Sequence, residues 1–232
     1  MENNQKQQQN KGILSWVKSV WDKKFLLILL AFMIIFLPVA MTREPVVLSK
    51  LLLTSIGIEK DESGYVVHGE IFIFNFDPFG VMERELVKGE GATVDEALTN
   101  MGHNLGQTPS LSHCSVIILG NGTQGEDILE LLKPFATSSQ INNSCALFYT
   151  TSDMEELMQT SIDTGDARSG RIHAISAFNK RQNKMTSTNL EQFFIGSMHG
   201  NKTIHISRLT VEDNRIINER TPVKFIAGRF TE

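Results

Sequence analysis

The amino-acid sequence predicts a mixed α/β domain, built of a layered sheet and helices, behind one N-terminal transmembrane helix. An uncharged run of 17 residues near the N-terminus predicts the membrane segment. Beyond it, short β-like runs alternate with amphipathic segments that begin with helix-capping residues, in the order β-β-α-β-α-β-α. The hydrophobic share of 41% and the charged share of 21% are typical of a globular body.

Residues 1–24 are expected to form a cytoplasmic tail. The first ten, MENNQKQQQN, are rich in Gln and Asn and predict disorder. In the following KGILSWVKSVWDKK, Trp16 and Trp21 recur with other apolar residues at helical spacing among lysines. This composition is typical of an amphipathic segment at a membrane interface, with tryptophan at headgroup level and lysine facing anionic lipid. The lipid bilayer is therefore one expected partner.

Residues 25–41, FLLILLAFMIIFLPVAM, are interpreted as a transmembrane signal anchor. Four lysines of residues 11–24 precede this run, and Arg43 and Glu44 follow it. The positive-inside rule then places the N-terminus in the cytoplasm and residues 42–232 outside the cell membrane. Cleavage of the segment is the competing interpretation, but Pro38 falls where a small residue should precede Ala40. The uncleaved anchor is favoured over cleavage.

The exported part begins with two expected strands. Residues 51–58 form an apolar run, EKDESG is typical of a turn, and residues 65–74 alternate in polarity, which together predict a β-hairpin. Phe72, Phe74 and Phe76 are expected on one buried face of the second strand.

Helices and strands then alternate. GATVDEALTNMGHNLGQ predicts a helix, because Thr93 and Glu96 match a capping box and the apolar residues fall on one face, namely Val94, Ala97, Leu98, Met101 and Leu105. SVIILGNG predicts a buried strand, GTQGEDILELLKPF a helix capped at Thr123, SCALFYTT a strand, and SDMEELMQ a helix capped at Ser152.

The pattern is weaker beyond Thr160. SIDTGDARSGR is expected to be a loop, IHAISAFNKRQNK a helix, and STNLEQFFIGSMHG a helix capped at Thr188. KTIHISRLTVED and TPVKFIAGRF are expected to be closing strands, separated by a turn around Asn214. The residues expected in the core are Leu53, Ile56, Phe72, Leu98, Val116, Ile118, Leu131 and Phe148.

Two short motifs could carry catalytic chemistry. His113 precedes Cys114 in SLSHCSVIILGN, but neighbouring residues of a strand point to opposite faces and cannot readily share a proton. Asp163 opens a DTG triplet like that of aspartic proteases, but its context is polar and a second carboxylate would have to come from a dimer partner. We therefore predict no catalytic residue.

Cofactor and metal sites are not predicted either. The six histidines stand apart, without the tight spacing of zinc ligands. GNGTQGE lies between a strand and a helix as a phosphate loop does, but it lacks the Lys-Ser/Thr ending of a P-loop. The net charge of −4, with no long basic run outside the N-terminal tail, excludes nucleic acid as an expected partner.

Cys114 and Cys145 both lie in the exported part, each in or beside a predicted strand. A disulfide between them is geometrically possible if the two strands are neighbours, and export would permit it. Two free, buried thiols are the alternative, which the sequence favours without excluding the bond.

Several motifs, taken in order, resemble the N-terminal region of the C subunits of spore germinant receptors, the Ger(x)C family. REPVVLSKLLLTSIGIEKDESG is similar to the start of the mature family members, with Ile56 to Lys60 matching their turn. GEGATVDEALTNMGHNL and LSHCSVIILGNGTQGEDILELLKPF are similar to the family's first helix and its His-containing strand with the helix after it. SCALFYTTSDMEELM, TNLEQFFIGSM and KFIAGRF are similar to later segments of the same region.

The resemblance implies a non-enzymatic protein displayed outside a bacterial cell membrane, where it assembles with membrane proteins such as multi-spanning germinant-receptor subunits. Family members typically carry a lipid on a cysteine, which this chain lacks at that place, so anchoring by its own helix is expected. Two alternatives remain: a generic membrane-anchored envelope protein unrelated to spores, or an extracytoplasmic hydrolase that uses Asp163 or Cys114.

Overall fold

The computed structural model describes Phe32 and residues 50–74, 82–137, 141–166, 170–182, 187–199 and 202–231. The chain divides into two units, Met1–Leu48 and Ser49–Glu232, and only Phe32, a helical and exposed residue, is described in the first. The predicted membrane segment, residues 25–41, otherwise lies outside the described residues. Among the residues that are described, no helix combines the length and the apolar character needed to cross a bilayer.

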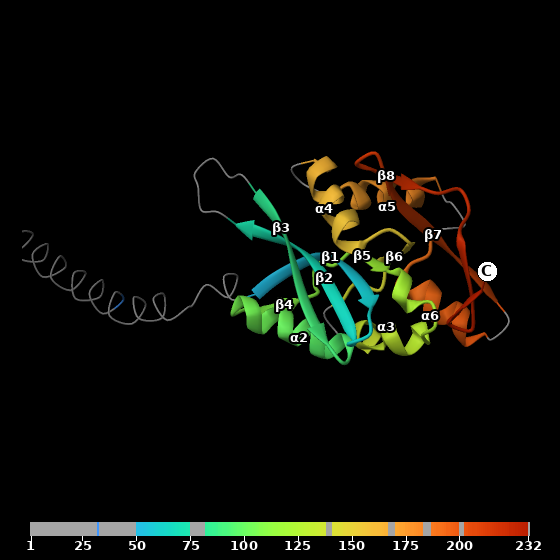
Figure 1. Ribbon diagram of the computed structural model, residues 1–232, viewed down its shortest axis with the longest axis horizontal. Helices are drawn as coiled ribbons and strands as arrows, with labels where there is room; N and C mark the ends of the chain where they lie inside the picture. Colours follow the sequence, from blue (N-terminus) through green and yellow to red (C-terminus); the bar gives the residue numbers. More distant parts are fainter. Residues whose placement is uncertain are drawn as a thin grey trace, which may run out of the picture. The chain divides into compact units, whose positions relative to one another are not determined.

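The second unit is built on a mixed sheet of ten strands (Figure 1). The strands run in the order β10-β9-β7-β6-β5-β1-β2-β3, with β4 beside β1 and β8 beside β7. The central strands β1, β5, β6 and β7 are mutually parallel, and antiparallel strands flank them on both sides. Their bounds are β1 Lys50–Lys60, β2 Tyr65–Phe74, β3 Met82–Gly91, β4 Thr108–Ser110, β5 Val116–Leu119, β6 Ala146–Thr150, β7 Thr203–Glu212, β8 Arg215–Asn218, β9 Val223–Ile226 and β10 Arg229–Thr231.

Helices cover both faces of this sheet (Figure 1). On one face lie α2 (Val94–Leu105), α3 (Ile128–Thr137) and α6 (Leu190–Met198), and on the other α4 (Met154–Thr164) and α5 (Arg171–Arg181). Alternate residues of the central strands pack into the two cores, one on each face of the sheet. In β5, Ile117 and Leu119 belong to the core under α2, α3 and α6, whereas Val116 and Ile118 belong to the core under α4 and α5. The mixed α/β architecture predicted from the sequence is confirmed.

The predicted hairpin is β1 with β2, which pair antiparallel from Lys60↔Tyr65 to Leu53↔Ile71. The sequence did not predict β3, which pairs along the whole of β2. Its sequence, MERELVKGEG, alternates in polarity, but only Val87 and Gly89 of its described residues are buried. It is an edge strand, and apart from the Arg84 side chain the other described side chains are exposed or half-exposed. The short strands β4, β8 and β10 also escaped prediction.

The predicted helices form, but three of the four predicted caps are wrong. Thr93 does cap α2, accepting a hydrogen bond from the Glu96 amide. The caps of α4 and α6 are Asp153 and Asn189, one residue beyond the predicted Ser152 and Thr188. The cap at Thr123 is wrong, because residues Asn121–Thr123 form a short 3-10 helix and the Thr123 hydroxyl donates to the Gly120 carbonyl.

The predicted core is confirmed at seven of its eight positions, since Leu53, Ile56, Leu98, Val116, Ile118, Leu131 and Phe148 are buried. Phe72 is only half-buried, and Phe74 and Phe76 have side chains outside the described part. The face of β2 that packs under α2 carries Val67, Gly69 and Ile71 instead, one position out of phase with the phenylalanines. Leu105, predicted on the apolar face of α2, is exposed near the end of the helix.

Candidate functional site

The residues considered for chemistry from the sequence do not converge. His113 is exposed and its Nδ1 lies 3.0 Å from the Ser112 hydroxyl, whereas the neighbouring Cys114 is buried in the sheet core. Asp163 does not lie in the predicted loop, because α4 continues to Thr164. Its exposed carboxylate accepts a hydrogen bond from the Gln159 amide one turn earlier, at 2.9 Å. Within the described part of the chain, the side-chain partner of His113 is the adjacent Ser112 and that of Asp163 is Gln159, so these residues do not form a shared acid–base site.

The glycine-rich segment GNGTQGE forms a structural turn with a paired carboxylate, Glu126, and is not a phosphate-binding loop. Glu126 accepts hydrogen bonds from the Lys60 ammonium and from the Tyr65 hydroxyl, the latter at 3.0 Å. These two bonds stabilise the charged form and lower the pKa of Glu126 below its ordinary value. A Cβ on Gly122 would meet the Lys60 carbonyl, so this turn packs directly against the end of β1. The turn is therefore a structural contact, held to the end of β1 by the Lys60–Glu126 ion pair.

A buried charged cluster lies under α4 and α5, and the sequence analysis missed it. Glu70 of β2 is 2% exposed and stands at its centre. One carboxylate oxygen accepts from the Arg84 guanidinium of β3 at 3.1 Å, and the other from the Ser55 hydroxyl of β1 at 2.6 Å. The imidazole Nε2 of His173, on α5, lies 3.5 Å from that second oxygen.

The cluster connects the sheet to the helices above it. A second Arg84 nitrogen donates to the carbonyls of Ile162 and Asp166, at the end of α4. Gly170, at the start of α5, lies directly over the ion pair, so that a Cβ there would approach both Arg84 and Glu70 to within about 3.2 Å. Polar interactions therefore fasten the α4–α5 connection to β2 and β3.

The charge state of Glu70 limits the chemistry of the cluster. Burial alone would raise the pKa of this carboxyl, but the opposing interactions with His173, Ser55 and Arg84 together lower it to about 2. A general acid or base works best when its pKa lies near the working pH, and Glu70 remains ionised well below neutrality. Its role is to compensate the buried Arg84 charge.

His173 also contacts an exposed hydroxyl. Its Nδ1 lies 2.7 Å from the Ser115 Oγ, just before β5, so the imidazole stands between a serine and a carboxylate. A hydroxyl, an imidazole and an acid in sequence are the components of acyl-transfer sites. Here, however, the carboxylate is already paired with Arg84, and neither Ser115 nor His173 lines the polar groove between α5 and α6. The geometry thus gives Ser115 a contact that positions α5 against β5.

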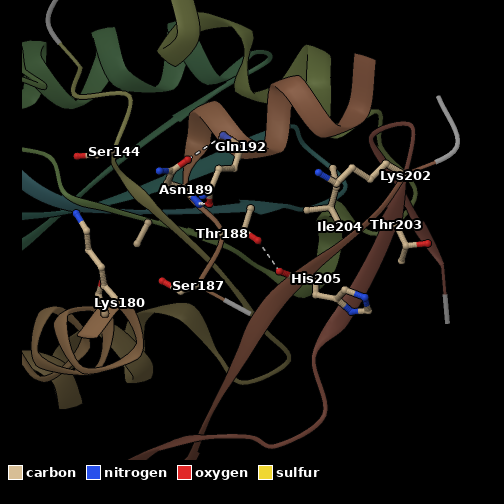
Figure 2. Close-up of a pocket in the computed structure, with 12 residues that line it drawn as sticks. Ser144, Lys180, Ser187, Thr188, Asn189, Gln192, Lys202, Thr203, Ile204 and His205 are labelled. Carbon is tan, nitrogen blue, oxygen red and sulfur yellow. Dashed lines mark hydrogen bonds between the residues drawn. The ribbon is translucent and has the colours of Figure 1, made fainter. Parts of the chain in front are cut away.

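A polar groove of about 710 Å³ lies between α5 and α6, over the amino ends of β6 and β7 (Figure 2). Figure 2 shows Lys180 of α5 at one end of the groove and Lys202, just before β7, at the other. Between them the Thr188 hydroxyl donates to the His205 carbonyl at 2.6 Å. The twelve lining residues are Ser144, Ala146, Ser176, Lys180, Ser187, Thr188, Asn189, Gln192, Lys202, Thr203, Ile204 and His205.

The groove has a positive character that comes from side chains alone. The first amides of α6 are already bonded, since Leu190, Glu191 and Gln192 donate to the Cys145 carbonyl, the Asn143 carbonyl and the Asn189 side chain. The lining residues that the structure describes include two lysines and no carboxylate. A groove with hydroxyls, amides and ammonium groups suits a polar or anionic surface better than an apolar ligand.

A family model for the spore germination protein N-terminal domain matches residues 50–211, more than half of the chain. The chain belongs to this family. No curated protein and no solved structure gives a significant match to it.

Membership confirms the Ger(x)C resemblance found in the motifs. The matched range begins with β1 and ends within β7, so it covers all four central parallel strands and every helix described above. Membership in this spore germination family indicates a germinant-receptor-related role for the chain. The Glu70 cluster and the polar groove both lie inside that shared region.

Proposed function

We propose that this protein is a membrane-tethered, non-enzymatic relative of germinant-receptor C subunits, which holds or assembles integral-membrane receptor subunits through protein–protein contacts. The observation that carries the proposal is the family match over residues 50–211. The chemistry of the described residues agrees with it, because the buried carboxylate at Glu70 is ionised at neutral pH and paired with Arg84.

The proposal places the domain outside a bacterial cell membrane. Residues 25–41 would anchor the chain, with residues 1–24 in the cytoplasm and residues 42–232 outside. Tethering to the same membrane as its partners would raise their effective concentration, so a surface of modest affinity would suffice for assembly.

The outer face of α6 is a suitable contact surface. Ile195 and Met198 lie three residues apart on this helix and are 50% and 78% exposed. Large apolar side chains that are exposed next to one another mark protein contacts more often than scattered single ones. Lys202 at the adjacent end of the groove adds a positive charge to this side of the domain.

Site-specific photocrosslinking in the native membrane tests the proposal. A photoreactive residue would replace Met198 in the full chain, and a matched variant would carry it at Glu155, an exposed position on α4. We expect Met198 to capture a multi-spanning germinant-receptor subunit and Glu155 to capture much less. Capture of only unrelated envelope proteins would favour the generic envelope role, and the absence of any membrane-protein adduct from either position would refute assembly.

The hydrolase alternative makes a different prediction. An enzyme that used Cys114 would need an accessible thiol, but this side chain is buried and lies beside Cys145. An enzyme that used Asp163 would need a partner carboxylate, and its hydrogen-bond partner is the amide of Gln159. The described geometry therefore does not support catalysis by Cys114 or by Asp163.

A further inference from the structure

Cys114 and Cys145 are the cysteines of this chain, and the fold places them side by side. Cys114 precedes β5 and Cys145 precedes β6, two neighbouring parallel strands that pair from Val116↔Ala146 onward. Their Sγ atoms lie 3.9 Å apart, and the side chains are 1% and 0% exposed. Both are free thiols in this structure.

The backbone on either side of the pair is already fixed. The Cys114 amide donates to the Leu111 carbonyl and the Cys145 amide to the Asn142 carbonyl, so each cysteine ends a turn. The Ala146 amide donates to the Ser115 carbonyl at 2.8 Å, which holds the two strand starts together. In the parallel register Val116↔Ala146, Cys145 stands at the level of Ser115, one residue after Cys114, and the 3.9 Å between the two Sγ atoms shows that the side chains nevertheless meet.

We propose that Cys114 and Cys145 form a disulfide bond in the mature protein, which ties the amino ends of β5 and β6 together. The Sγ atoms need only approach from 3.9 Å to about 2.0 Å, a change that side-chain rotation can supply. The inference rests on the extracytoplasmic location proposed above, because disulfides persist in oxidising compartments.

Oxidation proceeds by exchange with an external disulfide. The thiolate of one cysteine attacks a sulfur of an oxidised thiol–disulfide oxidoreductase and forms a mixed disulfide. The second cysteine thiolate then attacks that bond and releases the oxidoreductase as a dithiol. The two cysteines together lose two protons and two electrons, and the oxidoreductase disulfide gains them.

Burial determines when this step occurs. The adjacent Cys114 thiol and desolvation raise the pKa of Cys145, so little reactive thiolate is present once the domain has folded. An oxidoreductase also cannot reach two buried sulfurs. The bond therefore closes before folding is complete, and the closed bond then resists reduction in the native domain.

The disulfide would fix the backbone beside the polar groove. Cys145 stands between Ser144 and Ala146, which line the groove, and its carbonyl accepts from the first amide of α6. A covalent link to the start of β5 would hold these groups in place. It would also close a loop that contains β5 and α3.

Thiol counting on the full chain tests the proposal. Membranes from cells that export the protein are quenched with acid, denatured, and treated with a maleimide–polyethylene glycol reagent with or without prior reduction. We expect no adduct before reduction and two adducts after it. The Cys114→Ser and Cys145→Ser variants should each give one adduct under both conditions, which excludes a bond between chains.

A refolding experiment separates this proposal from the proposed function. The purified full chain is denatured, reduced, and refolded in detergent with oxidised glutathione, and the loss of two hydrogen atoms is measured by intact mass. Two outcomes would overturn the disulfide and leave the assembly role intact. One is two free thiols in protein that external protease can reach, and the other is failure of the disulfide to form on refolding. If the disulfide closes on refolding but the domain in cells is protected from external protease, the proposed extracytoplasmic location is wrong. The pairing of Cys114 with Cys145 would still stand.

Discussion

Replacing Glu70 by glutamine tests whether the buried cluster stabilises the domain by charge. The substitution keeps the size of the side chain and removes the negative charge that faces Arg84 and His173. Arg84 is itself buried, with 6% of its side chain exposed, so its guanidinium would lose its carboxylate partner inside the protein. Breaking a buried ion pair on one side costs about 3–5 kcal/mol, because the remaining charge stays desolvated.

The pH dependence of stability gives a second value for the free energy that the ionised Glu70 contributes to folding. The pKa of Glu70 is about 2 in the folded protein against an ordinary 4.5. A lowered carboxyl pKa stabilises the folded state above pH 4.5, and this contribution is lost as the pH falls from 4.5 towards 2. The difference corresponds to about 3 kcal/mol of unfolding free energy at neutral pH.

Urea unfolding curves recorded by circular dichroism between pH 2 and 7 measure both the loss of stability at neutral pH and its pH dependence. We expect Glu70→Gln to lose stability at pH 7 and to show a flatter decline than the wild type below pH 4.5. Glu85→Gln, which changes an exposed carboxylate next to Arg84, is the matched control and should follow the wild type. Parallel stability–pH curves for wild type and Glu70→Gln would refute the reasoning.

Three further outcomes follow from the fold and from the proposed topology. Ile118→Ala should lower the unfolding free energy by about 2–5 kcal/mol in urea titrations, because it leaves a cavity under α4 and α5, whereas Ile217→Ala on the half-exposed β8 should cost much less. Equal costs would contradict the assigned core. Asp163→Asn should leave germination-related function and melting temperature unchanged, since its described partner is the Gln159 amide, and lost function with an unchanged melting temperature would favour an enzyme. Protease added to intact protoplasts should remove residues 42–232 while sparing the N-terminal tail, and protection of the domain would exclude the proposed topology.

Local sequence patterns predicted the parts of this fold that depend on neighbouring residues. The apolar runs of β1 and β5 and the amphipathic face of α2 follow from burial at fixed periods, and these elements formed where expected. The caps of α4 and α6 were displaced by one residue, because polar residues that can cap stand next to one another at Ser152–Asp153 and Thr188–Asn189. Which of two adjacent oxygens meets the first amides depends on the angle at which the chain enters the helix.

The phase of β2 could not be obtained from its own sequence. In VVHGEIFIF both faces carry buried residues, Val67 and Ile71 on one and His68 and Glu70 on the other, so the phenylalanines did not identify the inner face. Gly69 occupies a position where Leu53 and Met101 approach closely, which only the packing of α2 reveals. A strand covered on both sides needs its neighbours before its faces can be assigned.

One signal for the buried cluster was nevertheless present in the sequence. Glu70 interrupts an apolar strand, and a carboxylate inside such a strand must be paired if it is buried. Its partners could not be identified in this way, because Ser55, Arg84 and His173 come from β1, β3 and α5. The same distribution explains why the cluster matters for the architecture. Since α4 packs on the sheet through apolar side chains while the α4–α5 connection is held through Arg84 and Glu70, loss of the ion pair should loosen that connection before it exposes the core.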